Sequence, residues 1–466
     1  MTQPEDSLPE RQDLVAAAPG APVSRRTVYG LLLLVAASLI GARILTVPGA
    51  FSANDQSRWA TIRALVENGS YSIGSRQYLP NGTYRDTGII AQPEWETADV
   101  VLHPDTGRFY SSKPTLLPTL LAGEYWFIRN LLHLNLRRDR LAVSRMILFT
   151  INLLPFVIYL LLLSRIADRL GTTEWGRLFV FVTAAFGTFV SGFLGSLNNH
   201  TVAAAGALFA VYHCLLIHLD EDRRPARFLL AGLFAGWTVC NELPAAGLVL
   251  GLLVWLLWLS PRDTLRYALP ALALPVGVYL FTQYLAVGSV VPTYAREQWY
   301  RFEGSYWGNP AGIDRADDPM LLYAFHLLVG HTGILSLTPM FVAGWIGMVR
   351  SALHEDAQVG RVASARRVLG CLTLALTVIT FAFYVVRTHN YGGITAGARW
   401  FIWLMPLWLL TMLPELDRWA ADGRRRAVAA ALLAFSIGTA SHALVNPWQP
   451  SWLFNWFTEW GLLVYS

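Results

Sequence analysis

A small set of polar and charged side chains lies beside the ends of long apolar runs. Charged residues make up only 14% of the 466-residue chain, about half the usual share of a soluble domain. A carboxylate can act as a general base, and ammonium and guanidinium groups bind phosphates. Such a set is typical of an enzyme that meets one substrate headgroup from the lipid and another from outside. The residues that could carry this chemistry are Asp55, Lys113, Arg145, Asn199, His200, Glu242, Arg296, Tyr391 and Arg399.

Asp55 follows the first apolar run directly, in Ser52-Ala53-Asn54-Asp55, and opens a short interfacial helix predicted over 55–67. Two interpretations stay open. Aspartate is favoured at helix starts because it accepts backbone N–H bonds, and it can also serve as a general base. Asp55 is the candidate catalytic residue of the chain.

Lys113 is the only lysine beside 35 arginines. An ammonium at a membrane interface can simply extend toward water, but arginine does this as well, and arginine is what this chain uses elsewhere. Lysine offers a compact point charge that suits a phosphate. We therefore predict that Lys113 contacts a donor phosphate.

Arg145 and Arg399 each lie at the outer end of an apolar run and are the other candidate donor-phosphate ligands, with contact to ordinary lipid headgroups as the alternative. The candidate substrate-binding residues are Asn199, His200, Glu242, Arg296 and Tyr391. Asn199 and His200 can also be read as a polar turn with helix caps.

The histidines and cysteines do not form a set with metal-ligand spacing, and the chain contains no glycine-rich nucleotide loop. We therefore expect no metal, no cofactor and no soluble sugar-nucleotide donor. The formal charge of +5 could indicate nucleic acid, but the arginines cluster between apolar runs, so membrane orientation explains them better and no nucleic-acid partner is expected.

The apolar runs have the length that crosses a bilayer. They predict an all-α polytopic membrane protein with about eleven transmembrane helices, and the run over 228–259 is a hairpin broken at 241–244. The expected spans are 28–47, 143–164, 178–196, 201–218, 228–241, 243–259, 267–286, 328–349, 368–386, 399–415 and 427–444.

The segment 114–133 is apolar but contains Glu124, Arg129 and His133. Counting it as a span would place most arginines outside, against the positive-inside rule, so we predict a helix on the outer surface. The expected organisation is a disordered cytoplasmic N-terminus (1–27), a transmembrane domain (28–444) with outer loops at 48–142 and 287–318, and an extracytoplasmic interfacial tail (445–466). This is the layout of a multi-pass protein of a bacterial inner membrane.

Transport of a lipid-linked glycan is one alternative function, and a non-catalytic membrane scaffold is another. A coupled transporter normally needs several buried ionisable groups near the midplane. Only Glu242 lies at that depth, beside the helix break. This argues against transport, and a cavity beneath the first outer loop would argue against the scaffold.

The layout resembles the GT-C glycosyltransferases, most closely the protein O-mannosyltransferase and lipid A aminoarabinose transferase group. Asp55 matches the first-loop acid of that family, Lys113-Pro114-Thr115-Leu116 is similar to its Lys-Pro-Pro-Leu-like motif, and Arg145 matches the basic residue at the second span. Gly397-Ala398-Arg399 is similar to a late Gly/Arg segment. The chain departs from the family at 198–200, where Asn-Asn-His stands in place of an acidic residue.

The resemblance implies a GT-C-like bundle and transfer of a hexosyl or pentosyl group from a polyprenyl-phosphate sugar to an extracytoplasmic acceptor (lipid, glycan or protein) of the cell envelope. It implies inversion at the anomeric carbon, with Asp55 as general base. Lys113, Arg145 and Arg399 would stabilise the charge on the departing phosphate.

Overall fold

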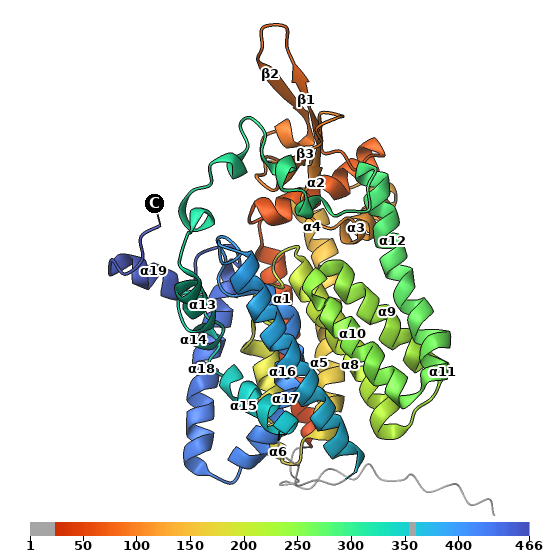
Figure 1. Cartoon of the computed structure of the whole chain (residues 1–466), viewed down its shortest axis with the longest axis vertical. Coiled ribbons are helices and arrows are strands. Elements are labelled where there is room, and N and C mark those ends of the chain that lie inside the picture. Colours follow the sequence, from red (N-terminus) through yellow and green to blue (C-terminus); the bar gives the residue numbers. More distant parts are fainter. Residues whose placement is uncertain (1–23, 354–359, 466) are drawn as a thin grey trace, which may run out of the picture.

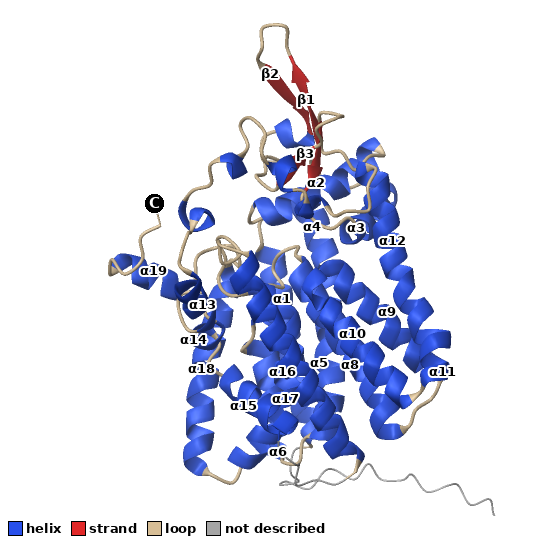
Figure 2. Ribbon diagram, in the orientation of Figure 1, coloured by secondary structure: helices blue, strands red, loops and turns tan. Residues whose placement is uncertain are grey.

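A computed structural model describes residues 24–353 and 360–465, which form a helical bundle with a small sheet and surface helices at one end (Figures 1 and 2). We call this the sheet end. The predicted all-helical membrane architecture is confirmed, whereas the count of eleven spans is not. Within the described residues, seven helical segments are long and apolar enough to cross a membrane: 25–46, 140–170, 174–192, 199–220, 261–287, 361–387 and 423–445. Two shorter apolar helices cover 243–259 and 341–353.

The helices of the bundle begin and end close to the predicted apolar runs. In chain order they are α1 (Arg25–Thr46), α4 (Arg140–Leu148), α5 (Leu154–Leu170), α6 (Glu174–Phe186), α7 (Phe189–Gly192), α8 (Asn199–Asp220), α9 (Pro225–Asn241), α10 (Ala246–Leu259), α11 (Pro261–Asp263), α12 (Leu269–Val287), α13 (Met320–Leu328), α14 (Ile334–Leu337), α15 (Phe341–Leu353), α16 (Arg361–Arg387), α17 (Met405–Trp419) and α18 (Gly423–Val445). Single π-helical turns, 149–153 and 264–268, join α4 to α5 and α11 to α12. The predicted segment 1–27 lies almost wholly outside the described residues.

The prediction of one span over 328–349 is wrong. The chain leaves the helix at Leu328, forms the short α14 and begins α15 only at Phe341. Pro339 explains the break between α14 and α15, because it lacks a backbone N–H and disfavours helical geometry in the residue before it. Thr338 accordingly has φ −131° and ψ 66°.

The layer at the sheet end contains the segments that surround the candidate site. It consists of α2 (Ala53–Asn68), β1 (Gly74–Tyr78), β2 (Tyr84–Gly88), β3 (Val100–Leu102), β4 (Arg108–Ser111) and α3 (Leu116–Leu132), followed near the C-terminus by α19 (Trp452–Glu459). The four strands are antiparallel in the order β2-β1-β4-β3. The hairpin predicted around Asn81-Gly82 is β1–β2, which projects beyond the rest of the molecule (Figure 1). The segment predicted over 114–133 is α3, which packs against α2 at this end.

The base of that hairpin requires glycine. Gly74 pairs with Gly88 across the two strands, and Gly88 has φ +94°. A Cβ atom on Gly88 would lie 2.5 Å from the Cα of Gly74. Only glycine permits both the backbone conformation and the close approach.

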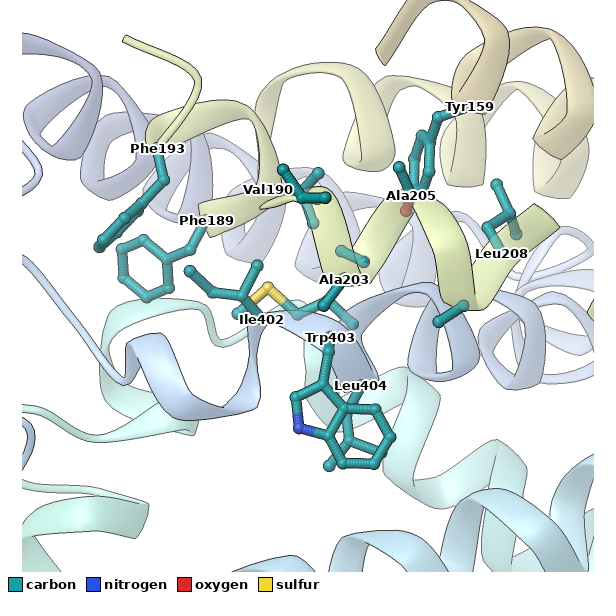
Figure 3. Close-up of a cluster of buried hydrophobic side chains, with 14 of the residues drawn as sticks. Tyr159, Phe189, Val190, Phe193, Ala203, Ala205, Leu208, Ile402, Trp403 and Leu404 are labelled. Atoms are coloured by element: carbon teal, nitrogen blue, oxygen red, sulfur yellow. The ribbon is translucent and has the colours of Figure 1, made fainter. Parts of the chain in front are cut away.

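The buried core surrounds α8, which is covered along nearly its whole length from His200 to His218. Small residues, among them the run 203–207, let neighbouring helices approach closely. Figure 3 shows side chains of α5, α7, α8 and the 3₁₀ segment 399–404 meeting in this core, including Tyr159, Phe189 and Trp403. Packing in this core therefore fixes the first turn of α8. It also fixes the 3₁₀ segment that begins at Arg399.

Candidate active site

A cavity of about 710 Å³ lies at the sheet end, where α2, the segment after β4, the first turn of α8 and the tip of the α9–α10 hairpin meet the end of α16. Its volume is within the range of small-molecule sites. Its polar lining is Asn54, Arg58, Asp99, Ser112, Lys113, Asn199, His200, Asn241, Glu242, Glu297, Arg301, Thr388, Asn390 and Arg399. Its apolar and aromatic lining is Pro114, Leu243, Pro244, Tyr294, Tyr300, Trp307, Phe383, Tyr384 and Trp400.

Arg58 reaches the cavity from the second turn of α2. Its guanidinium donates to the backbone oxygen of Asn54 at 2.8 Å and also bonds the side-chain oxygens of Asn54 and Asn199. The residue is only 2% exposed. Its partners are neutral amides, and none of the ion pairs found in residues 24–353 and 360–465 involves Arg58. Burial lowers the pKa of Arg58, and the nearby Asp99 opposes that effect.

Lys113 and Asp99 form an ion pair on the cavity wall, with 2.9 Å between Nζ and Oδ2. The β3–β4 hairpin brings them together, because Val100 pairs with Ser111 and the N–H of Ser112 donates to the backbone oxygen of Asp99. Burial lowers the pKa of Lys113 to about 8; Arg58 and Arg399 act in the same direction, and Asp99 opposes them. Burial raises the pKa of Asp99, but Lys113, Arg399 and Arg58 outweigh it, so the net shift is downward.

His200 and Glu242 form a buried pair between the first turn of α8 and the hairpin tip. The Nδ1 atom of His200 bonds Oε1 of Glu242, which also accepts from the Asn199 amide at 2.7 Å. The other ring nitrogen, Nε2, lies 3.5 Å from an Arg399 guanidinium nitrogen. Since a guanidinium only donates, Nε2 is the acceptor in that contact, which places the ring proton on Nδ1, facing Glu242.

Arg399 begins the 3₁₀ segment 399–404 and lies against Trp448, with its guanidinium carbon 5.0 Å from the ring centroid. Its Nε is buried without a hydrogen-bond partner. Within the described part of the chain, Arg399 has no carboxylate ion-pair partner. Like Arg58, it brings a positive charge to the cavity that no nearby acid matches directly.

The inner part of the cavity carries a surplus of positive charge. Three cations (Arg58, Lys113 and Arg399) face two carboxylates (Asp99 and Glu242), while Glu297 and Arg301 pair with each other at the rim. Buried charges are normally paired, because desolvation of a lone ion is costly. An anionic ligand with one negative charge would balance this surplus.

The structure brings five of the nine predicted residues into one cavity: Lys113, Asn199, His200, Glu242 and Arg399. The other four are not among the cavity-lining residues. Arg145 donates to the backbone oxygen of Val47 at 3.2 Å, and Arg296 donates to Ser289 and lies over Trp299. Tyr391 is fully buried and bonds Asp318.

Asp55 caps α2. Its carboxylate accepts backbone N–H bonds from Phe51 at 2.9 Å, Ser52 at 2.8 Å and Gln56 at 3.0 Å, and with Ser52 it forms a capping box. Burial raises the pKa of Asp55 to about 6, against the lowering effect of these bonds and of Arg58. Its neighbour Asn54 lines the cavity instead.

Sequence reasoning missed Arg58 and Asp99. A signal for Arg58 was present, because it lies one helical turn after Asn54 and so shares its face of α2. Asp99 could have been found by pairing the strands that flank the turn at 105–107, since that register sets residue 99 opposite residue 112. Residues 24–353 and 360–465 contain no group of three or more His, Cys, Asp or Glu side chains that could hold a metal ion.

Comparison by sequence finds no matching family model and no matching curated protein. Comparison of structures finds ArnT from Cupriavidus metallidurans in the apo state, with 14% identity and a TM-score of 0.47 over 88% of this chain and 64% of that one. The same ArnT bound to undecaprenyl phosphate matches with 14% identity and a TM-score of 0.46, over 90% of this chain and 70% of that one.

The archaeal oligosaccharyltransferase of Archaeoglobus fulgidus, tethered to an acceptor peptide, matches with 15% identity and a TM-score of 0.49 over 93% of this chain. The chain spans 57% of that structure's length and 64% of apo ArnT. At these identities the likeness is one of fold.

Proposed function

We propose that the chain transfers a glycosyl group from a polyprenyl-phosphate sugar to an acceptor on the outer side of a bacterial inner membrane. The observation that carries the proposal is the pair of cavity arginines, Arg58 and Arg399. Within the described residues neither has a carboxylate ion-pair partner, and both line the same cavity as the Lys113–Asp99 ion pair. A phosphate is the ligand that guanidinium and ammonium groups bind best together.

The change in charge during such a reaction fits this cavity. The donor phosphate is a diester with one negative charge, and the departing polyprenyl phosphate is a monoester that carries up to two. Arg58, Lys113 and Arg399 would stabilise the charge that develops as the bond breaks, in a site with little water. Arg145, predicted as a phosphate ligand together with Lys113 and Arg399, would act only on a donor that extends beyond the cavity.

The apolar and aromatic part of the lining suits the rest of the donor. Tyr384 and Trp400 stack with 4.4 Å between ring centroids and an interplanar angle of 5°, and both line the cavity. Leu243 and Phe383, at the hairpin tip and near the end of α16, are exposed on the surface of the bundle. A polyprenyl chain that leaves the cavity between these helices would pass directly into the lipid.

The proton of the acceptor hydroxyl needs a base, and we assign that role to His200. The acceptor hydroxyl replaces the Arg399 guanidinium as the partner of Nε2. Its oxygen attacks the anomeric carbon, the bond from that carbon to the phosphate oxygen breaks with its electron pair, and the proton moves to Nε2. Glu242 holds the opposite nitrogen and stabilises the imidazolium that forms. Attack opposite the leaving phosphate inverts the anomeric centre.

The base predicted from the sequence was Asp55, and that role stays a prediction. The two assignments differ in outcome. If His200 is the base, His200→Gln and Glu242→Gln lose about 10²–10⁴-fold in turnover while donor binding persists. If Asp55 is the base, Asp55→Asn shows this loss instead.

The donor-binding part of the proposal is tested by native mass spectrometry of the purified chain with undecaprenyl phosphate, undecaprenol and inorganic phosphate as probes. We expect retention of undecaprenyl phosphate over undecaprenol, and loss of retention in Arg399→Ala. Arg296→Ala is the matched control, because Arg296 does not line the cavity. Equal retention of the alcohol and the phosphate would overturn the assignment.

The transfer itself is tested with a panel of undecaprenyl-phosphate hexoses and pentoses and isolated envelope membranes as the acceptor source. We expect release of undecaprenyl phosphate from at least one donor and its absence with His200→Gln. Movement of an intact lipid-linked sugar across proteoliposomes, without cleavage, would favour a transporter instead.

A further inference from the structure

Asp318 lies outside the cavity, on the second outer loop, yet it binds two tyrosines from distant parts of the chain. Its Oδ2 accepts hydrogen bonds from the Tyr391 hydroxyl at 2.5 Å and from the Tyr465 hydroxyl at 2.9 Å. Tyr391 belongs to the segment that leads into Arg399, and Tyr465 follows α19. One carboxylate thus joins three segments that are far apart in the sequence.

A histidine completes this cluster. His331 is fully buried, and its Nε2 lies 3.1 Å from the Tyr465 hydroxyl. Because that hydroxyl has one proton and directs it to Asp318, His331 donates through Nε2. The His331 ring also meets the Tyr391 ring edge to face, with 4.8 Å between centroids.

The segment 391–393, which this cluster fixes, has a backbone conformation that is unfavourable on its own. Tyr391, Gly392 and Gly393 have φ of +54°, +89° and +73°. A tyrosine at positive φ is unfavourable and persists only where its surroundings fix it. The surroundings here are the Asp318 bond, the N–H bond from Tyr391 to the Tyr323 hydroxyl at 3.2 Å, and the stacking of these two rings at 4.2 Å.

The segment contacts the cavity cation directly. A Cβ atom on Gly392 would lie 3.1 Å from Nε of Arg399, so the bare glycine backbone packs against the guanidinium. Asn390, which precedes Tyr391, lines the cavity and donates to Asp314 at 3.1 Å. A shift of Tyr391 would therefore move both Arg399 and Asn390.

We propose that Asp318, Tyr391, Tyr465 and His331 form a positioning clamp that fixes segment 388–399 and so holds the Arg399 guanidinium in the cavity. The clamp residues do not touch the substrate. Tyr391, which the sequence predicts as a substrate contact, then lies behind the cavity lining and supports it instead. The part of the inference that concerns the donor phosphate rests on the proposed function, whereas the part that concerns the placement of Arg399 does not.

The test compares Asp318→Asn and Tyr465→Phe with the wild type. Asp317→Asn is the matched control, because Asp317 is an exposed neighbour that loses the same charge. Two readouts report on placement without any lipid: hydrogen exchange of peptides that cover 388–399, and modification of Arg399 by phenylglyoxal, read by peptide mapping. We expect faster exchange and greater modification in both clamp variants and neither in the control.

The donor readout is the affinity for undecaprenyl phosphate. We expect a loss of about tenfold in Asp318→Asn, the size of one charged hydrogen bond, and no further loss when Asp318→Asn is added to Arg399→Ala, because the clamp acts through Arg399. Unchanged exchange and modification in both clamp variants would overturn the inference. If the wild type binds no undecaprenyl phosphate, the proposed function fails, while the placement readouts still decide on the clamp.

Discussion

Replacement of Lys113 by arginine should remove an alkaline limit on donor binding. Burial lowers the pKa of Lys113 to about 8, so this ammonium loses its charge within an accessible range. The ordinary pKa of a guanidinium lies above 12, and even where burial lowers it to about 10, as for Arg58, the group stays mostly charged at pH 9. The variant therefore keeps the positive charge next to Asp99 and changes only its response to pH.

The size of the effect follows from the pKa. Between pH 7.5 and pH 9 the charged fraction of a group with pKa 8 falls from about three quarters to about one tenth. If only the charged form binds the phosphate, affinity falls roughly eightfold in the wild type and stays level in Lys113→Arg. A phosphate monoester, with a second pKa near 6, changes its own charge little over this range.

The assay is the affinity for undecaprenyl phosphate in detergent micelles from pH 7.5 to pH 9, read from intrinsic tryptophan fluorescence. Undecaprenol serves as the ligand control, because its binding should not depend on the charge of Lys113. If the wild type and Lys113→Arg show the same pH profile, Lys113 does not provide the phosphate charge and the electrostatic account of the cavity is wrong.

Further predictions concern the acid pair, the helix cap and the bundle. Asp99→Asn should lower the pH at which donor binding is lost in the same assay, because Asp99 opposes the lowering of the Lys113 pKa. A shift of that pH to a higher value would contradict this. Burial raises the pKa of Asp55 to about 6, so the folded state binds its proton more tightly than the unfolded chain does. The contribution of Asp55 to stability should accordingly be largest below about pH 4 and fall by up to about 3 kcal/mol as the pH rises through 6, and the difference in unfolding temperature between the wild type and Asp55→Asn should change with pH in this sense. A Cβ atom on Gly347 would lie 1.9 Å from the Thr411 backbone oxygen, whereas one on Gly277 meets nothing within 4 Å. Gly347→Ala should therefore cost about 1–3 kcal/mol of stability and lower the unfolding temperature, and similar temperatures for the two alanine variants would refute the packing argument.

The helices were largely predictable because a bilayer leaves few choices for an apolar run. The exception at 328–349 shows what a hydropathy reading omits. Pro339 interrupts the backbone without reducing the apolar character of the run, so α14 and α15 appeared as parts of one span. The number of crossings depends on such local breaks and was predicted less well than the class of fold.

The candidate site was partly predictable. Lys113 stood out by its residue type alone, and Asn199, His200, Glu242 and Arg399 stood out as polar residues at the ends of apolar runs. Asp99 and Arg58 needed a strand register and the docking of α2, which composition does not reveal. For Asp55 the sequence leaves two roles open, and only the fold shows that its oxygens face the backbone of residues 51, 52 and 56.

The enclosure of α8 by its neighbours has a consequence for biogenesis. A helix that is covered on all sides contacts little lipid in the finished protein, so its final place exists only after α5, α9 and α17 have assembled around it. The polar start of α8 meets Glu242 as soon as α9 packs against α8, but it meets Arg399 only at that later stage. A partly inserted chain therefore lacks the His200–Arg399 contact, and competence for chemistry would arise in the last steps of membrane assembly rather than during synthesis of the individual spans.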